Sequence, residues 1–244
     1  MNRKDRLFEH TVTEPGDFVF DERVVRVFPD MINRSVPGYA TVVSMTAMLA
    51  RRYAMPGTRI YDLGCSLGAA TLAMREAVSA KNIEIVAVDS SPEMVAQLRG
   101  LLPVDEDTGR PGVTVCEDDI RSIEIENASV VVLNFTLQFI DPEARSELVS
   151  RIADGLWPGG VLLLSEKIRF DDPREQALQT EWHHDFKRSQ GYSDLEIARK
   201  RDALENVLVP DTLEEHRERL RAAGFSRVYR WQQGFNFVSL VAVR

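Results

Sequence analysis

The most regular feature of the chain is a series of short apolar runs rich in β-branched residues. They cover residues 59–64, 83–89, 113–117, 128–135 and 160–166. Strands that are buried on both faces of a sheet have this composition. Segments with helical periodicity lie between most of them, near residues 69–79, 91–102 and 143–155, and another amphipathic segment precedes them at 40–54. The pattern predicts an α/β fold with a doubly wound, mostly parallel sheet.

The alternation of strand and helix stops after residue 166. Two helices are expected at 172–190 and 193–207, and a third at 211–224 that begins with Asp211 or Thr212 as its cap. Two further apolar stretches around Gly234 resemble a strand hairpin that returns into the sheet.

Length and composition describe an ordinary globular protein. The 244 residues are 44% hydrophobic and 28% charged, which suits a single domain over 1–244. We expect residues 1–57 to be an N-terminal helical extension that begins with an irregular leader at 1–20. The segment 172–207 is expected to be a helical insertion beside the sheet's edge, where it serves as a lid or a dimer interface.

Charge and cysteine content limit the partners and the compartment. The formal net charge of −8 disfavours unaided binding of a nucleic acid. The two cysteines, Cys65 and Cys116, have no metal-type spacing, so no metal site is predicted. The chain shows no signal-peptide core and no apolar run long enough to cross a bilayer. These features favour a cytoplasmic protein without a membrane partner.

A small-residue turn follows the first apolar run, in the stretch IYDLGCSLGAATLAM. It contains Gly64, Ser66 and Gly68, so it fits both the Gly-x-Ser-x-Gly elbow of a hydrolase and a turn that lets a nucleotide cofactor approach the backbone. A hydrolase elbow follows several strands, whereas this turn follows the first. The later histidines all lie in predicted helices. The cofactor interpretation is therefore favoured over Ser66 as a nucleophile.

Polar residues follow the next three predicted strands. Asp89 ends the second strand, about 20 residues after the glycine turn, where an acid accepts hydrogen bonds from ribose hydroxyls. Asp119 and Ile120 follow the third strand, where an acid and an apolar side chain suit an adenine ring. Asn134 ends the fourth. Open α/β sheets bind ligands at the carboxyl ends of their strands, so we expect these residues to meet in one site.

The form of the turn distinguishes between two adenosyl ligands. The dinucleotide fingerprint G-x-G-x-x-G is absent, because position 66 is serine and the third glycine is missing. Residues 62–68, DLGCSLG, instead resemble the D-x-G-x-x-x-G motif of class I S-adenosylmethionine-dependent methyltransferases. That resemblance implies S-adenosyl-L-methionine as the ligand and a seven-stranded sheet whose last strand is antiparallel.

Segments outside this motif resemble a narrower family, the carboxy-S-adenosyl-L-methionine synthases. They include residues 16–39, NASVVVLNFTLQFI at 127–140, LSEKIRF at 164–170 and FKRSQGYSDLEIARKRDALENVL at 186–208. The resemblance implies a homodimer that converts S-adenosyl-L-methionine and prephenate to carboxy-S-adenosyl-L-methionine, phenylpyruvate and water. A separate tRNA carboxymethyltransferase would use this product to modify a wobble uridine, so the synthase itself would need no nucleic acid.

The same resemblance assigns the site residue by residue. The ligand-binding residues it implies are Tyr39, Gly64, Cys65, Ser66, Asp89, Ser90, Asp119, Ile120, Asn134 and Arg201. Ser90 departs from the family, which commonly has asparagine there. Arg201 is the catalytic candidate, because a guanidinium matches the new carboxylate with two parallel donors. The prephenate carboxylates need further basic groups, for which the candidates are Arg34, Lys167, Arg169 and Lys200.

Two other functions share the glycine turn. One is an S-adenosylmethionine-dependent methyltransferase that acts on a small molecule or on tRNA. The other is a non-catalytic protein that keeps the cofactor as a structural ligand. A carboxylate-binding arginine in the segment 186–208 distinguishes the synthase, because a methyltransferase has no carboxylate to hold beside the transferred methyl group.

Overall fold

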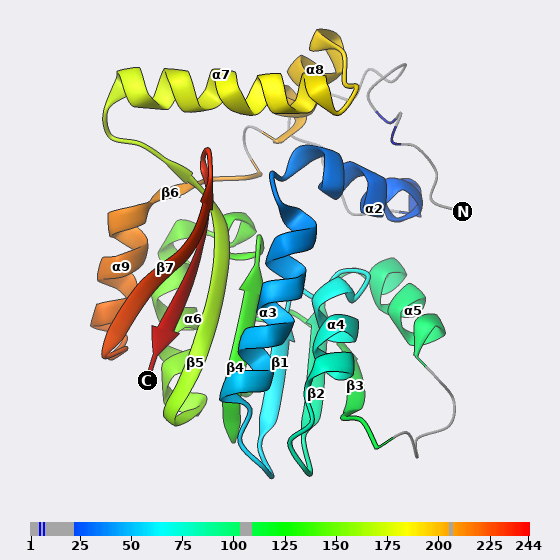
Figure 1. Ribbon diagram of the computed structural model, residues 1–244, viewed down its shortest axis with the longest axis vertical. Coiled ribbons are helices and arrows are strands. Elements are labelled where there is room, and N and C mark those ends of the chain that lie inside the picture. Colours follow the sequence, from blue (N-terminus) through cyan, green and yellow to red (C-terminus); the bar gives the residue numbers. More distant parts are fainter. Residues whose placement is uncertain (1–4, 6, 8–21, 103–108, 205–206) are drawn as a thin grey trace.

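The fold consists of one central sheet with helices on both faces and a further pair of helices above it (Figure 1). The computed structural model describes Asp5, Leu7 and residues 22–102, 109–204 and 207–244. The predicted leader at 1–20 therefore lies outside the described residues, apart from Asp5 and Leu7.

The main path of the sheet has the strand order β3-β2-β1-β4-β5-β8-β7. Neighbours from β3 to β5 are parallel, and β8 is antiparallel to both β5 and β7. This confirms the predicted doubly wound sheet with an antiparallel last strand. The strands are β1 (Arg59–Leu63), β2 (Glu84–Asp89), β3 (Gly112–Glu117), β4 (Ala128–Asn134), β5 (Leu156–Arg169), β6 (Asp211–Thr212), β7 (Arg227–Gly234) and β8 (Phe237–Val243).

Helices cover both faces of this sheet. Side chains from α3 and α4 pack on one face, and side chains from α6 and α9 pack on the other (Figure 1). The helices are α2 (Glu22–Ser35), α3 (Tyr39–Tyr53), α4 (Ala69–Ala77), α5 (Pro92–Leu101), the 3-10 helix η1 (Leu137–Phe139), α6 (Pro142–Gly155), α7 (Pro173–Ser189), α8 (Asp194–Leu204) and α9 (Leu213–Ala222).

The central strand β4 shows why these apolar runs become strands. Val130 and Val132 pack in the cluster with α3 and α4, whereas Val131 and Leu133 pack in the cluster on the opposite face. All four are fully buried. Burial of each such side chain contributes roughly 1.5–3 kcal/mol relative to exposure. The two-residue period of a strand therefore matches a run that is apolar at every position.

The helices α7 and α8 lie above the carboxyl ends of the parallel strands (Figure 1). The sequence pattern correctly predicted two helices here, and their role as a lid or a dimer interface stays a prediction. Asp172 caps α7, because its side chain accepts a hydrogen bond from the Arg174 backbone N–H. The strand β5 leads into this cap and brings α7 over the sheet rather than past it.

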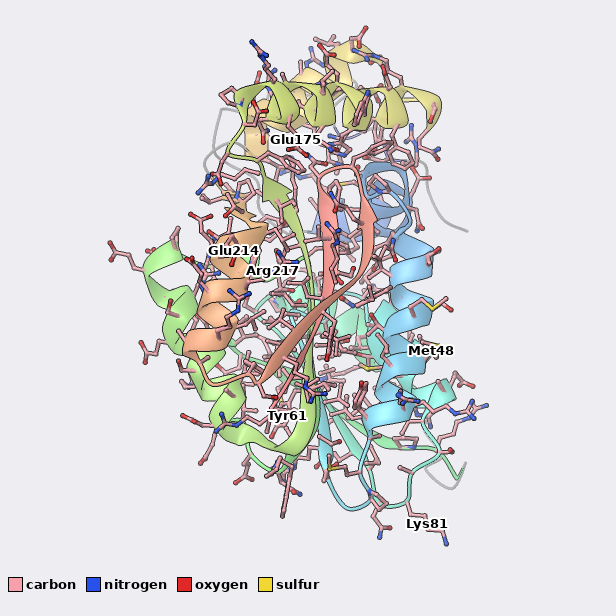
Figure 2. The ribbon with its side chains drawn as sticks, turned by 60° about the vertical axis from the view of Figure 1, so that its left-hand side comes forward. Met48, Tyr61, Lys81, Glu175, Glu214 and Arg217 are labelled. Carbon is pink, nitrogen blue, oxygen red and sulfur yellow. The ribbon has the colours of Figure 1, made fainter. Side chains whose placement is uncertain are left out.

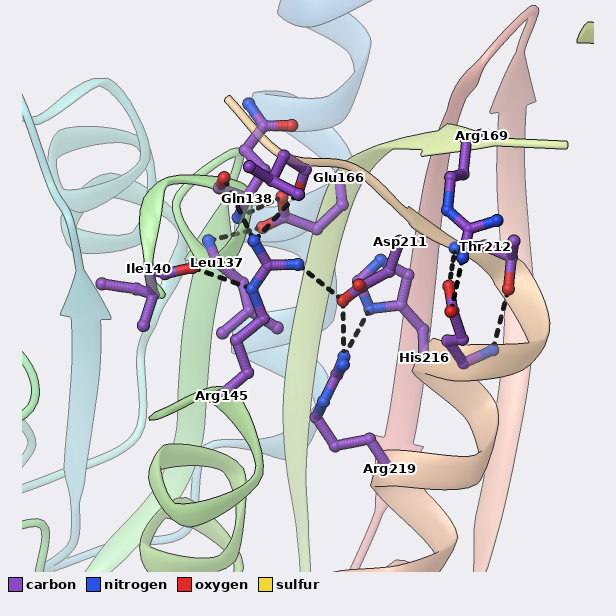
Figure 3. Close-up of polar contacts among 12 residues, drawn as sticks. Leu137, Gln138, Ile140, Arg145, Glu166, Arg169, Asp211, Thr212, His216 and Arg219 are labelled. Atoms are coloured by element: carbon purple, nitrogen blue, oxygen red, sulfur yellow. Dashed lines mark hydrogen bonds and ion pairs between the residues drawn. The ribbon is translucent and has the colours of Figure 1, made fainter. Parts of the chain in front are cut away.

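Several boundaries differ from those predicted. The strand β5 extends beyond the predicted run at both ends. The strand β6 was not predicted; it is two residues long and pairs Asp211 with Ile168 of β5. Thr212 then caps α9 through a capping box with Glu215. Asp211 instead forms ion pairs of 2.8 Å with Arg145 and with Arg219 (Figure 3). In the part of the chain that the structure describes, no helix has the length and apolar character needed to cross a membrane.

Candidate active site

A cavity of about 640 Å³ opens at the carboxyl ends of the parallel strands, under α7 and α8. Nine of the ten predicted ligand-binding residues line it, and Arg201 does not. The nine come from the turns after β1 to β4 and from the first residue of α3. The rule that places ligands at the strand ends of an open α/β sheet therefore predicted the position of this cavity.

The turn after β1 has an unusual backbone conformation that its close packing requires. Gly64 has φ of 76°, and a Cβ atom there would lie 2.4 Å from the Thr136 side chain. Ser66 also has a positive φ, at 50°, which is costly for a residue other than glycine. Its backbone N–H donates to Asp89 Oδ2 at 2.8 Å. This bond from the second strand stabilises the strained turn.

Two carboxylates support the turn, of which Asp62 is buried and Asp89 is half-buried. Asp89 Oδ1 accepts a further hydrogen bond from the Ser91 N–H at 2.9 Å. Burial raises the pKa of Asp89, and the backbone N–H groups that bind it oppose this shift. Asp62 is 2% exposed and accepts a hydrogen bond from Thr71 Oγ1 at 2.5 Å. Burial raises the pKa of Asp62 to about 6. This end of the cavity is therefore acidic, which suits a ligand that brings hydroxyl donors and positive charge.

The turn after β3 closes the same end of the cavity. Asp119 and Ile120 both line it, as the sequence predicted. The Arg121 guanidinium binds the Asp119 carboxylate at 2.5 Å and lowers the pKa of that group. Ile120 is 5% exposed and packs in the main core cluster. An acid beside a fixed apolar side chain can accept from an adenine amino group while the ring lies against the apolar neighbour.

Asn134, at the end of β4, supplies the most direct sign of a ligand. Both polar atoms of its side-chain amide are buried, and neither finds a hydrogen-bond partner among the described residues. Buried amides are almost always hydrogen-bonded, because an unpaired group costs about 1–3 kcal/mol. The side chain lines the cavity. Its unpaired donor and acceptor fit a polar ligand at this position.

The residue after Asn134 is also held in an unusual conformation. Phe135 has φ of 61°, and its N–H donates to the Ser165 carbonyl at 2.6 Å. Its ring lies 6.2 Å from that of Tyr39 and 6.0 Å from that of Phe237, measured between centroids. These three rings form an apolar wall of the cavity. Positive φ at a non-glycine residue beside a cavity is typical of a functional site.

Glu166 fixes the turn that follows Phe135. Its carboxylate accepts three backbone hydrogen bonds, from Leu137 at 2.8 Å and Gln138 at 3.0 Å (Figure 3) and from Thr136 at 3.1 Å. Burial raises the pKa of Glu166, and these donors together with the charge of Arg145 oppose this shift. A carboxylate at the end of β5 thereby determines the path of the chain after β4.

The opposite end of the cavity is basic. Lys167 of β5, Lys187 of α7 and Lys200 of α8 all line it. Burial lowers the pKa of Lys200 to about 8, and burial together with the charges of Lys200 and Lys167 lowers that of Lys187 to about 7. His183 lies beside them, and its Nε2 bonds to the Ser35 carbonyl at 2.8 Å. The cavity therefore has one acidic end and one basic end.

Three predicted basic residues lie elsewhere. Arg201 has a side chain that is 63% exposed and pairs with Asp202 at 3.1 Å, so its role remains a prediction. Arg34 is buried under the Tyr192 ring, 3.9 Å from its centroid, and bonds to the Gln190 carbonyl. Arg169 pairs with Asp171 and Glu215. Of the four candidates for the prephenate carboxylates, Lys167 and Lys200 are the two that line the cavity.

The hydrolase interpretation of Ser66 finds no support in its surroundings. Ser66 Oγ lies 3.3 Å from Met94 Sδ. Among the described histidines, His183 bonds to Ser35, His184 lies with its ring 6.4 Å from that of His183 between centroids, and His216 contacts Arg219. A nucleophilic serine requires a base within hydrogen-bond reach, and none of these rings contacts Ser66.

Sequence reasoning did not assign three residues that shape the site. Lys187 was absent from the candidates because it lies in an ordinary charged helix. Phe135 gave no local sign of a positive φ. Glu166 had one available signal, since it is an acid at the end of an otherwise apolar strand, and a charge in that position requires partners.

Comparisons with known proteins agree with this geometry. A family model described as a methyltransferase domain matches residues 60–160. Human N-acetylserotonin methyltransferase, in a crystal structure with S-adenosylmethionine, superposes with a TM-score of 0.62 at 18% identity, over 91% of this chain and 55% of that one. A carboxy-S-adenosyl-L-methionine synthase from Geobacter sp. (strain M21) is 57% identical over 100% of both chains. One from Escherichia coli O17:K52:H18 is 52% identical, over 100% of this chain and 98% of its own.

The family model and the structural neighbour define the class of fold, which is that of the methyltransferases. Sequence identity above 50% over the full length identifies the family more specifically than the fold does. The chain belongs to the carboxy-S-adenosyl-L-methionine synthase family and is an enzyme.

Proposed function

We propose that this enzyme converts S-adenosyl-L-methionine and prephenate to carboxy-S-adenosyl-L-methionine, phenylpyruvate and water. The atoms balance, because prephenate exceeds phenylpyruvate by one carbon dioxide and one water. The carbon dioxide replaces a hydrogen of the cofactor's methyl group. That hydrogen leaves with the prephenate hydroxyl as water.

One observation carries this proposal: the cavity is acidic at one end and basic at the other. The acidic end has Asp62, Asp89 and Asp119, and the basic end has Lys167 and Lys187. A sulfonium ligand with ribose hydroxyls is favoured at the first, and a dianion such as prephenate at the second. The two ligands would then be held in contact, as a reaction between them requires.

The residues at the acidic end fit S-adenosyl-L-methionine. Asp89 offers carboxylate oxygens to ribose hydroxyls, and Gly64 lines the cavity without a side chain. The Asn134 amide has an unpaired donor and an unpaired acceptor among the described residues. Tyr39 contributes an aromatic ring beside them. We assign the remaining predicted positions, Cys65, Ser66, Ser90, Asp119 and Ile120, to the same ligand.

The protein's part in the reaction is then mainly positional. It binds both ligands, orients them and keeps water from the captured carbon dioxide. Loss of carbon dioxide and hydroxyl makes the prephenate ring aromatic, which is strongly favourable. The reaction needs no side-chain base, because the departing hydroxyl takes the proton.

Arg201 is retained as the proposed receptor of the new carboxylate. Its exposed side chain does not line the cavity of the single chain. The role therefore requires a conformation or an assembly other than the single chain described. We propose a homodimer that uses the segment 172–207 as its interface.

The wider setting is also proposed. The product would serve a tRNA carboxymethyltransferase in wobble-uridine modification, and the enzyme would work in the cytoplasm. The two free cysteines agree with a reducing compartment.

The test is incubation of the purified enzyme with S-adenosyl-L-methionine and with prephenate labelled at the leaving carboxyl carbon. We expect the label in a cofactor whose mass has increased by one carboxyl group, together with an equal amount of phenylpyruvate. A cofactor without label, in an enzyme that methylates a small molecule or tRNA instead, would establish the methyltransferase alternative. Retention of unchanged cofactor without turnover would indicate a binding protein.

A further inference from the structure

Three lysine side chains from three different elements meet at the basic end of the cavity. They are Lys167 of β5, Lys187 of α7 and Lys200 of α8, and we call them the lysine cluster. Lys187 is 8% exposed and Lys200 is 5% exposed. An ammonium group is strongly hydrated, so burying several of them at one wall costs free energy. This arrangement needs an anion to offset the free-energy cost of the buried positive charges.

The protein's own carboxylates neutralise the positive charge of the lysine cluster only in part. Lys200 Nζ lies 4.0 Å from Asp5 Oδ2 and donates to Ser35 Oγ at 2.8 Å. Asp5 also accepts a hydrogen bond from the Tyr192 hydroxyl at 2.5 Å. Within the described part of the chain, the ammonium groups of Lys167 and Lys187 have no ion pair and no hydrogen bond. Lys200 therefore has an anchoring contact, whereas Lys167 and Lys187 are available to a ligand.

The nearest carboxylate along β5 does not neutralise Lys167. Glu166 is its neighbour in sequence, but successive strand residues point to opposite faces. The Glu166 carboxylate is occupied by the backbone N–H groups of Thr136, Leu137 and Gln138. The positive charge of the cluster is thus directed into the cavity.

The walls beside the cluster define the rest of the ligand. Phe135 and Phe237 are apolar rings in edge contact, and Tyr39 lies next to Phe135. His183 stacks edge-on against Phe237, with 5.0 Å between ring centroids. Burial lowers the pKa of His183 to about 2, so this ring is neutral. A compact ring with two carboxylates matches apolar walls beside separate ammonium groups.

We propose that Lys167, Lys187 and Lys200 form the subsite for both carboxylates of a dianionic co-substrate, and that this cluster selects dicarboxylates over monocarboxylates. The assignment rests on the proposed function, in which that co-substrate is prephenate. Lys167 and Lys187 supply the free charges, and Lys200 holds α8 against α2 while adding a third charge.

The test replaces each free charge with an apolar side chain of similar length, as Lys167→Met and Lys187→Met. The matched control is Lys81→Met, because Lys81 lies at the far end of the molecule from α7 (Figure 2). We expect KM for prephenate to rise about 10- to 100-fold in each cluster variant, since each loses a charge-assisted contact. Affinity for S-adenosyl-L-methionine, measured by calorimetry, should change less than twofold. The control should match the wild type in both.

Two further measurements separate binding from folding. Lys187→Arg keeps the charge, so its KM for prephenate should stay within about threefold of the wild type. Phenylpyruvate is a monocarboxylate, so the wild type should bind it, as an inhibitor, more weakly than it binds prephenate. The ratio of these two affinities should be smaller in both Met variants. The melting temperature of the ligand-free Met variants should equal or exceed that of the wild type, because a buried uncompensated charge is removed.

The outcomes distinguish this inference from the proposed function. If the wild type consumes prephenate and both Met variants keep its KM, the subsite is wrong and the function stands. If the Met variants lose affinity for both ligands in parallel, the lysines are structural and the subsite is also wrong. If the wild type neither binds nor consumes prephenate, the function and the subsite fall together.

Discussion

The two ends of the cavity are built in opposite ways. The acidic end consists of turns after consecutive strands, and its carboxylates are paired within the protein, as Asp89 is with the N–H groups of Ser66 and Ser91. The basic end combines β5 with α7 and α8, and Lys167 and Lys187 have no such partners among the described residues. The carboxylates of this first end are satisfied without a ligand, whereas the Asn134 amide there has no partner among the described residues. The second still requires negative charge, which is how a site for an anion differs from a structural ion pair.

The two ends of the cavity also differ in how they are attached to the rest of the fold. The glycine turn directly follows β1 of the sheet, whereas the connection between α7 and α8 is held to α2 by a few side chains. Arg34 lies 3.9 Å from the centroid of the Tyr192 ring and donates to the Gln190 carbonyl at 2.8 Å. The basic end therefore depends on contacts between segments that are distant in sequence, and we expect it to be the easier end to disturb.

The largest effect is expected for Asp89→Ala, which removes the central acid of the acidic end. Affinity for S-adenosyl-L-methionine should fall by about 2–4 kcal/mol, because the ribose hydroxyls lose a charged acceptor. The fold should lose about 1–3 kcal/mol, because the N–H groups of Ser66 and Ser91 lose theirs. Calorimetric titration and urea unfolding measure the two effects. Affinity equal to that of the wild type would remove Asp89 from the ligand site.

Glu166→Gln replaces the residue that lies between the acidic and the basic end of the cavity. Glu166 fixes the turn after Asn134 and precedes Lys167, so its loss should weaken both ligands together. We expect the free energy of unfolding to fall by about 1–3 kcal/mol, because an amide oxygen replaces a carboxylate that accepts three N–H groups. Urea unfolding measures it, with Glu175→Gln on the surface of α7 as the control (Figure 2). A selective loss of one ligand would contradict the connecting role.

Asn134→Ala sharpens the distinction between a ligand contact and a structural one. The amide has no partner among the described residues, so the ligand-free protein should lose little stability. Affinity for S-adenosyl-L-methionine should fall by about 1–2 kcal/mol as two hydrogen bonds are lost. Calorimetry and thermal unfolding of the same sample check both parts. A stability loss without an affinity loss would make Asn134 structural.

The pH dependence of protein stability reports on the basic end of the cavity in the absence of a ligand. Burial and the neighbouring lysines lower the pKa of Lys187 to about 7, from 10.5. Between these values the unfolded chain binds more protons than the folded one, so this group makes the wild type more stable as pH rises from 7 to 10.5. Lys187→Met should lack this gain in stability with pH. Each kcal/mol of the missing gain should appear as a difference of roughly 2–4 °C between the melting temperatures of the two proteins. Parallel profiles in the two proteins would show that the lysine is not perturbed.

The smallest effect is expected for Ser66→Ala. Ser66 contributes its backbone N–H to Asp89, and alanine keeps that group. Activity should stay within about twofold of the wild type, and a fluorophosphonate probe should not label the wild-type serine. Labelling that is lost in the variant would restore the hydrolase interpretation.

The sequence by itself determined the acidic end of the site. Gly64, Asp89, Asp119 and Asn134 follow consecutive strands, and a parallel sheet brings the ends of its strands to one edge. Local spacing therefore fixes their neighbourhood once the strands are recognised. The apolar runs were recognisable because strands buried on both faces are apolar at every position.

Only the tertiary structure decided the basic end and the exact path of the chain around it. Lys187 becomes a site residue because α7 crosses above the strands, and the left-handed conformation of Phe135 depends on Glu166 of another strand. Arg34 and Arg169 are cationic residue types like Lys167, yet partners distant in sequence hold them away from the cavity. The physical reason is that burial and pairing of a charge depend on long-range packing, which residue type and spacing do not specify.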